Sequence, residues 1–169
     1  IFTPWLAGER CPVDDRNVRA AFYNLSLSTT RAHMVRSVFE GVAFNARWML
    51  DAVEKFVRRP LGAIRFIGGG AASDVWCQIH ADVLDRPVHR VEAPLLANVR
   101  GAALFASMVL GEVQQSQVPQ LARIDATFEP QRANRAVYDE LYREYPGLYH
   151  RQRKMYARLN GRKSAPQRA

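Results

Sequence analysis

The part of the chain best suited to hold a ligand is a run of three glycines between a strand pattern and a helix pattern. Gly68, Gly69 and Gly70 follow the mainly apolar residues 63–67 and precede a helix that should begin near Ser73. Glycine has no side chain, so backbone amides can lie directly against a ligand, and the first amides of a helix are unpaired and partly positive. Such a segment favours a nucleotide site. It matches neither a P-loop nor a GxGxxG fingerprint, and a tight structural turn is the commoner meaning of clustered glycines.

A long helix is expected ahead of the glycines. Apolar residues recur at steps of three and four across residues 34–56, which puts them on one stripe. A hydroxyl within residues 28–30 can cap the first turn, and the Arg-Arg-Pro run at 58–60 ends the helix. A glycine inside a helix costs ~1 kcal/mol relative to alanine, so Gly41 predicts the close approach of another element.

The elements after the glycines complete an α/β pattern. We expect a second helix over 74–84, a second strand over 88–91 and a third helix over 98–110. A final helical region over 138–159 carries a stripe of tyrosines, and Pro146-Gly147 is expected to break it. The opening segment is rich in turn-forming residues and is expected to be a surface loop.

Composition argues for one folded domain. The chain has 169 residues, of which 48% are hydrophobic, and no run of about 20 apolar residues could span a membrane. Cys11 and Cys77 form no CxxC pair, which favours a reducing compartment such as the cytoplasm. The net charge of +8 could indicate a nucleic-acid-binding domain. That interpretation is the least favoured, because no aromatic-basic RNA-binding signature accompanies the charge.

One longer segment resembles a known family. The sequence GGGAASDVWCQIHADVLDRPV, residues 68–88, is similar to the adenosine-binding motif of the FGGY carbohydrate kinases, which belong to the actin-like, ribonuclease-H-like ATPase superfamily. Three more segments resemble the family in order and spacing: FTPWLAGERCPVDD at 2–15, TRAHMVRSVFEGVAFNARWML at 30–50 and NVRGAALFASMVLGEV at 98–113. Among subfamilies, GERCP and GGGAASDVW look closest to xylulokinase-like members.

The resemblance implies a fold and its limits. We expect a ribonuclease-H-like C-terminal domain over residues 1–160, truncated at its N-terminal side, and a disordered tail over 161–169. A sheet that lacks its first strands would expose an edge, which favours association such as a homodimer.

The resemblance also implies site residues. Gly69, Gly70 and Ala71 match the backbone that lies against the adenosine of ATP. Ser73 matches a polar contact near the helix start, although plain helix capping is the favoured interpretation of this serine. Gln78 and the residue four positions later, Asp82, are expected to brace the loop without touching the ligand.

The implied reaction is the transfer of the ATP γ-phosphate to a sugar or polyol hydroxyl with Mg²⁺, and a pentulose such as xylulose is the expected substrate. In this family the catalytic aspartate and most of the sugar pocket lie in an N-terminal domain, so no catalytic residue and no metal ligand is assigned in this chain. Phosphoryl transfer requires positioning, metal and charge neutralisation together. The chain alone is therefore expected to supply the adenosine side of the site and to be inactive. The alternative is a degenerate nucleotide-binding or regulatory module.

Overall fold

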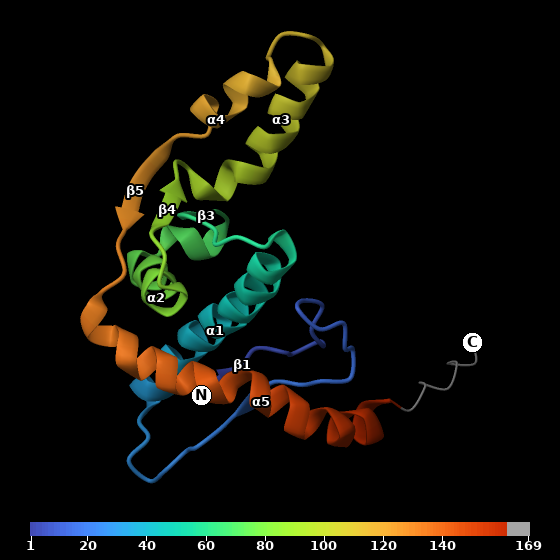
Figure 1. Ribbon diagram of the computed structural model, residues 1–169, viewed down its shortest axis with the longest axis vertical. Coiled ribbons are helices and arrows are strands. Elements are labelled where there is room, and N and C mark those ends of the chain that lie inside the picture. Colours follow the sequence, from blue (N-terminus) through green and yellow to red (C-terminus); the bar gives the residue numbers. More distant parts are fainter. Residues whose placement is uncertain (162–169) are drawn as a thin grey trace. The chain divides into compact units, whose positions relative to one another are not determined.

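The computed structural model describes residues 1–161 and divides the chain into two units. Unit 1 combines residues 1–59 with the chain from Arg135 onward, and unit 2 is the continuous segment 60–134 (Figure 1). The predicted disordered tail lies outside the described residues, apart from Gly161. No helix within residues 1–161 is both long enough and apolar enough to cross a membrane.

Unit 1 consists of two long helices and a short antiparallel ribbon. The ribbon pairs β1 (Phe2–Thr3) with β2 (Ala21–Phe22), so part of the opening segment is strand where a loop was expected. The helices are α1 (Arg31–Val57) and α5 (Arg135–Asn160).

Helix α1 has the predicted start and end. Thr30 is the N-cap, and its side-chain oxygen accepts a hydrogen bond from the His33 amide at 3.2 Å. The Thr30 amide in turn donates to Nδ1 of His33 at 3.3 Å, which completes a capping box. Arg58 ends the helix in the left-handed conformation, with φ +56. Thr30 is thus one of the three capping candidates that the sequence offered.

Gly41 lies where α1 meets β1, which confirms the predicted close approach. A Cβ atom added at Gly41 would lie 2.2 Å from the carbonyl oxygen of Phe2 and 3.1 Å from its ring. The hydroxyl of Tyr145, on α5, donates to the Gly41 carbonyl at 3.2 Å. Burial raises the pKa of Tyr145 above its ordinary value, so this hydroxyl stays protonated and remains a donor.

The core of unit 1 is aromatic and is centred on Trp5, whose side chain is fully buried. Its ring centroid lies 5.9 Å from that of Tyr145 and 6.0 Å from that of Tyr149, both in edge-to-face geometry. The indole nitrogen donates to Oδ1 of Asn45 at 3.0 Å, and the Asn45 amide donates to Glu9 at 3.0 Å. The tyrosine stripe therefore binds the opening segment to α1 and α5.

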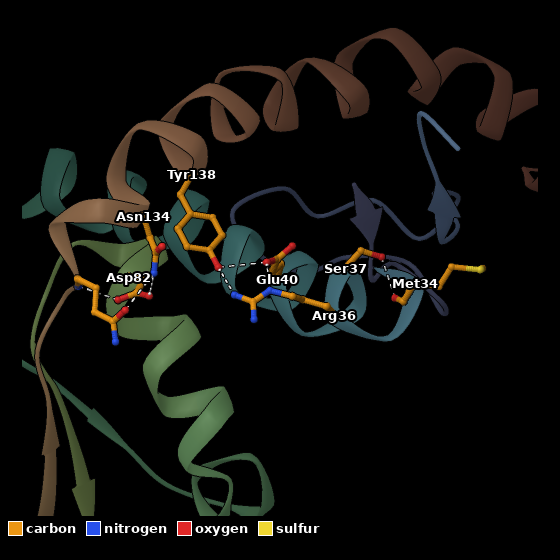
Figure 2. Close-up of polar contacts among 8 residues, drawn as sticks. Met34, Arg36, Ser37, Glu40, Asp82, Asn134 and Tyr138 are labelled. Atoms are coloured by element: carbon orange, nitrogen blue, oxygen red, sulfur yellow. Dashed lines mark hydrogen bonds and ion pairs between the residues drawn. The ribbon is translucent and has the colours of Figure 1, made fainter. Parts of the chain in front are cut away.

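Glu40 on α1 is satisfied within the same unit. Its carboxylate accepts hydrogen bonds from Arg36 at 2.8 Å and from the Tyr138 hydroxyl at 3.1 Å, and Figure 2 shows the three side chains together. Arg36 also donates to the Tyr138 hydroxyl at 2.9 Å. These contacts satisfy the Glu40 carboxylate within unit 1 and link α1 to α5.

Helix α5 continues through Pro146, so the predicted break there is wrong. Proline lacks an amide and crowds the preceding turn, which normally kinks or ends a helix. Here Tyr142 and Tyr145 before the proline, and Tyr149 after it, all form aromatic contacts with residues of unit 1. Tertiary packing on both sides of Pro146 offsets the local penalty.

Unit 2 is built on a three-stranded mixed sheet with strand order β3-β4-β5. Strand β3 (Ile64–Phe66) pairs in parallel with β4 (Val88–Val91), and β5 (Ile124–Phe128) pairs antiparallel to β4. The register shifts between Arg90 and Val91. Strand β3 thus lies at an edge of the sheet that the described residues form.

Strand β5 was not expected, although its sequence carries a strand signal. Apolar or small residues alternate with Asp125 and Thr127 across residues 124–128. A period of two is typical of a strand. The run covers only five residues, and no element is assigned to it from the sequence alone.

Short helices join the strands of unit 2. The crossover from β3 to β4 contains η1 (Gly69–Ala72) and α2 (Asp74–Leu84). Between β4 and β5 lie η2, α3, η3 and α4, and η4 follows β5 (Pro94–Leu96, Ala97–Val109, Gln115–Gln117, Val118–Leu121 and Arg132–Asn134). One face of the sheet packs on α2 through a buried cluster (Cys77, Ala81 and Val88, with Phe66 and Phe128 beside it). This packing fixes the start of α2 against β3, where the glycine run lies.

Candidate functional site

The glycine run forms a tight turn from β3 into α2, with a short 3₁₀ helix between them. Gly68 has φ +83, a left-handed conformation that favours glycine, and its amide donates to the Pro94 carbonyl at 2.9 Å. The 3₁₀ helix η1 follows directly, and Ser73 then caps α2 by accepting from the Trp76 amide at 3.3 Å. The sequence pattern of strand, glycine turn and helix start is therefore present as a structure.

The four predicted binding residues lie together in this turn, but they face different surroundings. Gly69 is exposed, and a Cβ atom there would meet only Leu95, at 3.9 Å. A Cβ atom at Gly70 would lie 2.9 Å from the Trp76 ring. Ala71 is fully buried, backbone included, and its amide donates to the Gly68 carbonyl at 3.2 Å, so it lies beneath the exposed surface of the turn. The oxygen of Ser73 is engaged in the cap, and its hydroxyl proton can still be donated.

The residues that brace the turn differ from those expected. Trp76 fills the space beside Gly70, and the Cys77 thiol donates to the Ala71 carbonyl at 3.3 Å. Burial raises the pKa of Cys77, which keeps the thiol protonated as a donor. Both residues come from the first turn of α2, so the helix itself holds the loop.

Gln78 and Asp82 brace a different segment. Asp82, which is buried, accepts hydrogen bonds from Gln78 at 2.8 Å, from the Gln131 amide at 2.8 Å and from Asn134 at 2.7 Å. Figure 2 shows Asp82 beside Asn134. Gln78 also donates to the Glu129 carbonyl at 2.8 Å. The expectation that this pair braces the glycine loop is therefore wrong, because its partners lie after β5.

His80 is a buried base next to the glycine turn. Its ring is 4.5 Å from that of Phe66 and 5.8 Å from that of Trp76, measured between centroids. Its Nδ1 lies 2.9 Å from the Trp76 carbonyl, which can only accept, so Nδ1 carries the proton of a neutral imidazole. Burial lowers the pKa of His80 below its ordinary value.

We expect unit 2 to lose stability as the pH falls below about 6.5, the ordinary pKa of histidine. The unfolded chain binds a proton at His80 in this range while the folded chain does not, so the free energy of unfolding rises with pH, by at most about 1.4 kcal/mol per unit. Urea unfolding of the wild type and of His80→Phe between pH 5 and 8 measures this dependence. An equal slope in both proteins over this range would contradict it.

A cavity of about 430 Å³ lies beside the turn and was not anticipated. Ala72, residues 93–96, Arg90 and Asp125 line it. Arg90 donates to Asp125 at 2.8 Å and to Asp74 in the first turn of α2, and its guanidinium lies 5.7 Å from the centre of the Phe128 ring. The hydrogen bonds with Asp125 and Asp74 raise the pKa of Arg90. No motif indicated Arg90 and Asp125, because Asp125 joins the site only through the unexpected strand β5.

Metal ligands do not gather within the described part of the chain. No group of three or more His, Cys, Asp or Glu side chains with the geometry of a metal site occurs in residues 1–161. These residues therefore do not fit a cage of protein ligands for Mg²⁺.

Comparison with solved structures gives the class of protein. A ligand-bound xylulose kinase from Lactobacillus acidophilus matches with a TM-score of 0.83 and 29% identity, covering 94% of this chain and 32% of that one. A gluconate kinase from the same organism matches with a TM-score of 0.82, 29% identity and the same coverage. The fold is therefore the α/β, actin-like ATPase fold of the sugar kinases, as expected, and its likeness does not separate xylulose from gluconate as substrate.

The family model of the FGGY carbohydrate kinases, C-terminal domain, matches residues 1–110. This chain belongs to the FGGY family of carbohydrate kinases. The xylulose kinase of Staphylococcus epidermidis is 34% identical over 167 residues, which cover 94% of this chain and 32% of that protein. The chain thus spans about a third of the length of the curated relatives it matches first.

Proposed function

We propose that this chain holds the adenosine of ATP against Gly69, Gly70, Ala71 and Ser73, as one part of a longer carbohydrate kinase. The full-length kinase would transfer the γ-phosphate of ATP to a hydroxyl of a sugar or polyol. A pentulose such as xylulose is the proposed acceptor, and the xylulose kinases among the relatives support it. Gluconate is the competing acceptor.

The observation that carries this proposal is the open backbone of the glycine turn. Gly69 and Gly70 begin a 3₁₀ helix, and within residues 1–161 their amides donate no hydrogen bond. Free amides at a helix start attract acceptor atoms and negative charge. The exposed face of Gly69 leaves room for a ligand to contact them.

The cavity beside the turn supports the proposal because it suits a purine ring. Its volume of about 430 Å³ lies within the ~300–1,000 Å³ range of small-molecule sites. Pro94, Leu95 and Leu96 give it an apolar wall, while Arg90 and Asp125 form a polar end. We propose that Mg²⁺ accompanies the phosphates of the nucleotide.

Catalysis is proposed to need the rest of a full-length kinase. A nucleotide-holding turn alone positions one substrate, whereas phosphoryl transfer also requires an oriented hydroxyl and neutralised charge. We therefore propose that the 169-residue chain does not phosphorylate a sugar by itself. Turnover of xylulose or gluconate by the purified chain in a coupled ADP-release assay would refute this.

Blocking the turn should abolish nucleotide binding. Gly69→Phe is the suitable variant, because a side chain at Gly69 enters open space, whereas one at Gly70 would collide with Trp76. Calorimetric titration with MgADP and MgATP should show at least tenfold weaker binding by Gly69→Phe than by the wild type.

The control for this titration is Gly62→Phe, since a Cβ atom at Gly62 meets nothing within 4 Å and the residue lies before β3. Gly62→Phe should bind like the wild type. Unchanged nucleotide binding by Gly69→Phe would show that the nucleotide does not bind at this turn. The same titration on a full-length relative tells whether an absent signal reflects an incomplete site.

The runner-up function is a nucleotide-binding or regulatory module without catalysis. Such a module would bind nucleotide at the same glycine turn as a kinase, and it would lack the catalytic groups that a kinase has elsewhere in the protein. Kinase activity in the longer protein that contains this sequence, lost on Gly69→Phe, favours the enzyme over the module.

We also propose a cytoplasmic location for the kinase. The free thiols of Cys11 and Cys77 support this location, since disulfides are rare in the cytoplasm. A homodimer stays a prediction.

A further inference from the structure

A second cavity of about 340 Å³ lies within unit 2, apart from the glycine turn. Its lining comes from β3, the end of β4, α3 and α4, and includes Arg65, Ile67, Val91 and Leu104. None of the residues that line it belongs to the run 68–73. The proposed adenosine site therefore does not account for this cavity.

The cavity combines an apolar surface with uncompensated positive charge. Arg65 and Arg100 both line it, and no acidic residue does. The Nη1 atom of Arg100 is buried and has no hydrogen-bond partner within residues 1–161. No ion pair of Arg65 or Arg100 occurs in that part of the chain either. Buried donors of this kind normally have a partner, and each exception calls for an explanation.

The start of helix α3 adds partial positive charge next to Arg100. Arg100 lies in the first turns of α3, which begins at Ala97 and has no acidic residue in its first turn and no side-chain cap. The start of a helix carries partial positive charge, which favours an anion and disfavours a further cation. Arg100 therefore lies at a helix start that favours an anion, and its Nη1 atom has no hydrogen-bond partner within residues 1–161.

We propose that this cavity binds a small molecule that joins one anionic group, a phosphate or carboxylate, to a compact apolar body. The guanidinium of Arg100 would form charge-assisted hydrogen bonds to the anion, and Arg65 would add attraction at longer range. The apolar body would lie against Ile67, Val91 and Leu104. The volume lies at the lower end of the range of ligand sites, which restricts the ligand to a small one.

Two variants test the proposal without disturbing the core. Arg100→Met removes the charge and keeps a long side chain, so it should not lower the stability of the fold. Gly101→Leu fills the cavity, because Gly101 lines it and a Cβ atom there meets nothing within 4 Å. Leucine also favours a helix interior more than glycine does. Arg132→Met, an exposed arginine away from the cavity, is the matched control.

The probes separate the two halves of the ligand. Phenyl phosphate and benzoate carry an anion on an apolar ring, inorganic phosphate carries only the anion, and benzyl alcohol carries only the ring. Calorimetric titration of the 169-residue chain should show that phenyl phosphate or benzoate binds at least tenfold more tightly than inorganic phosphate and than benzyl alcohol. Arg100→Met and Gly101→Leu should each weaken that binding at least tenfold, and Arg132→Met should not.

Amide chemical shifts locate the probe. Changes should centre on Arg65, Ile67 and residues 97–104, and saturating MgADP should not displace the probe. Equal binding to the wild type and both cavity variants would overturn the proposal, as would the absence of binding by both ring anions. Displacement by MgADP would assign the probe to the nucleotide site instead. The effects of Arg100→Met and Gly101→Leu and the shift changes at residues 97–104 do not depend on whether the chain binds ATP.

Discussion

Replacing Trp5 by alanine is expected to lower the free energy of unfolding of unit 1 by about 3–5 kcal/mol, the usual range for deleting a buried aromatic side chain. Trp5 is fully buried and contacts aromatic rings from α1 and α5, including Trp48 and Tyr145. Its removal also leaves Oδ1 of Asn45 without its indole donor. Urea unfolding followed by far-ultraviolet circular dichroism measures the loss.

Trp5→Phe is the control, because it retains an aromatic ring and loses the indole hydrogen bond. It should destabilise clearly less than Trp5→Ala. A second control, Leu6→Ala, alters a neighbour that is 76% exposed and should change stability by less than ~0.5 kcal/mol. Similar unfolding curves for Trp5→Ala and Leu6→Ala would show that the aromatic cluster does not hold the opening segment.

Gly41→Leu is expected to prevent unit 1 from folding with β1 in place. Even the first atom of a side chain at Gly41 would lie 2.2 Å from the Phe2 carbonyl oxygen, and backbone cannot yield as a flexible side chain can. Gly41→Ala has two opposing effects on stability. Overpacking against Phe2 costs about 1–3 kcal/mol, whereas the higher helix propensity of alanine contributes ~1 kcal/mol. We expect a net loss of stability with alanine and loss of cooperative unfolding with leucine.

Thermal unfolding by calorimetry compares these variants with Gly62→Ala. A Cβ atom at Gly62 meets nothing within 4 Å, so this control should be neutral or slightly stabilising. Gly41→Ala should unfold at a lower temperature than the wild type. If Gly41→Ala unfolds at a higher temperature, helix propensity outweighs the contact with Phe2 and the close approach is not a real constraint.

Elements with strong local signals were predictable from the sequence. The strand over 88–91 and the helix over 74–84 have the predicted bounds, and α1 starts from one of three candidate caps. These elements combine periodic apolar residues with a capping or turn-forming residue at each end. Gly41 could be interpreted because a glycine in a helix needs a physical reason, and the structure supplies one in Phe2.

The features that sequence reasoning missed depend on contacts distant in the chain. Pro146 should break α5 by local rules, and packing of Tyr145 and Tyr149 prevents it. Strand β5 alternates over only five residues and becomes a strand by pairing with β4. Local patterns contain no information about either partner.

The candidate site also contains features that could be predicted from the sequence and features that could not. The glycine turn and the Ser73 cap follow from residue types in sequence order, so they were predictable. The cavity wall that carries Arg90 and Asp125 requires β5 to lie against β4, and no spacing reveals it. Gln78 and Asp82 were assigned to the wrong segment because their helix position is local, while their partners at 129–134 are not.

The division of the chain into two units affects when each unit can fold during synthesis. Unit 2 is one continuous segment, residues 60–134. Unit 1 joins two stretches of chain, and Trp5 has its ring partners at Tyr145 and Tyr149. Its aromatic core therefore cannot close until the ribosome has released Tyr149. Throughout that interval the indole of Trp5 lacks these two partners, and an apolar side chain left exposed in this way favours aggregation.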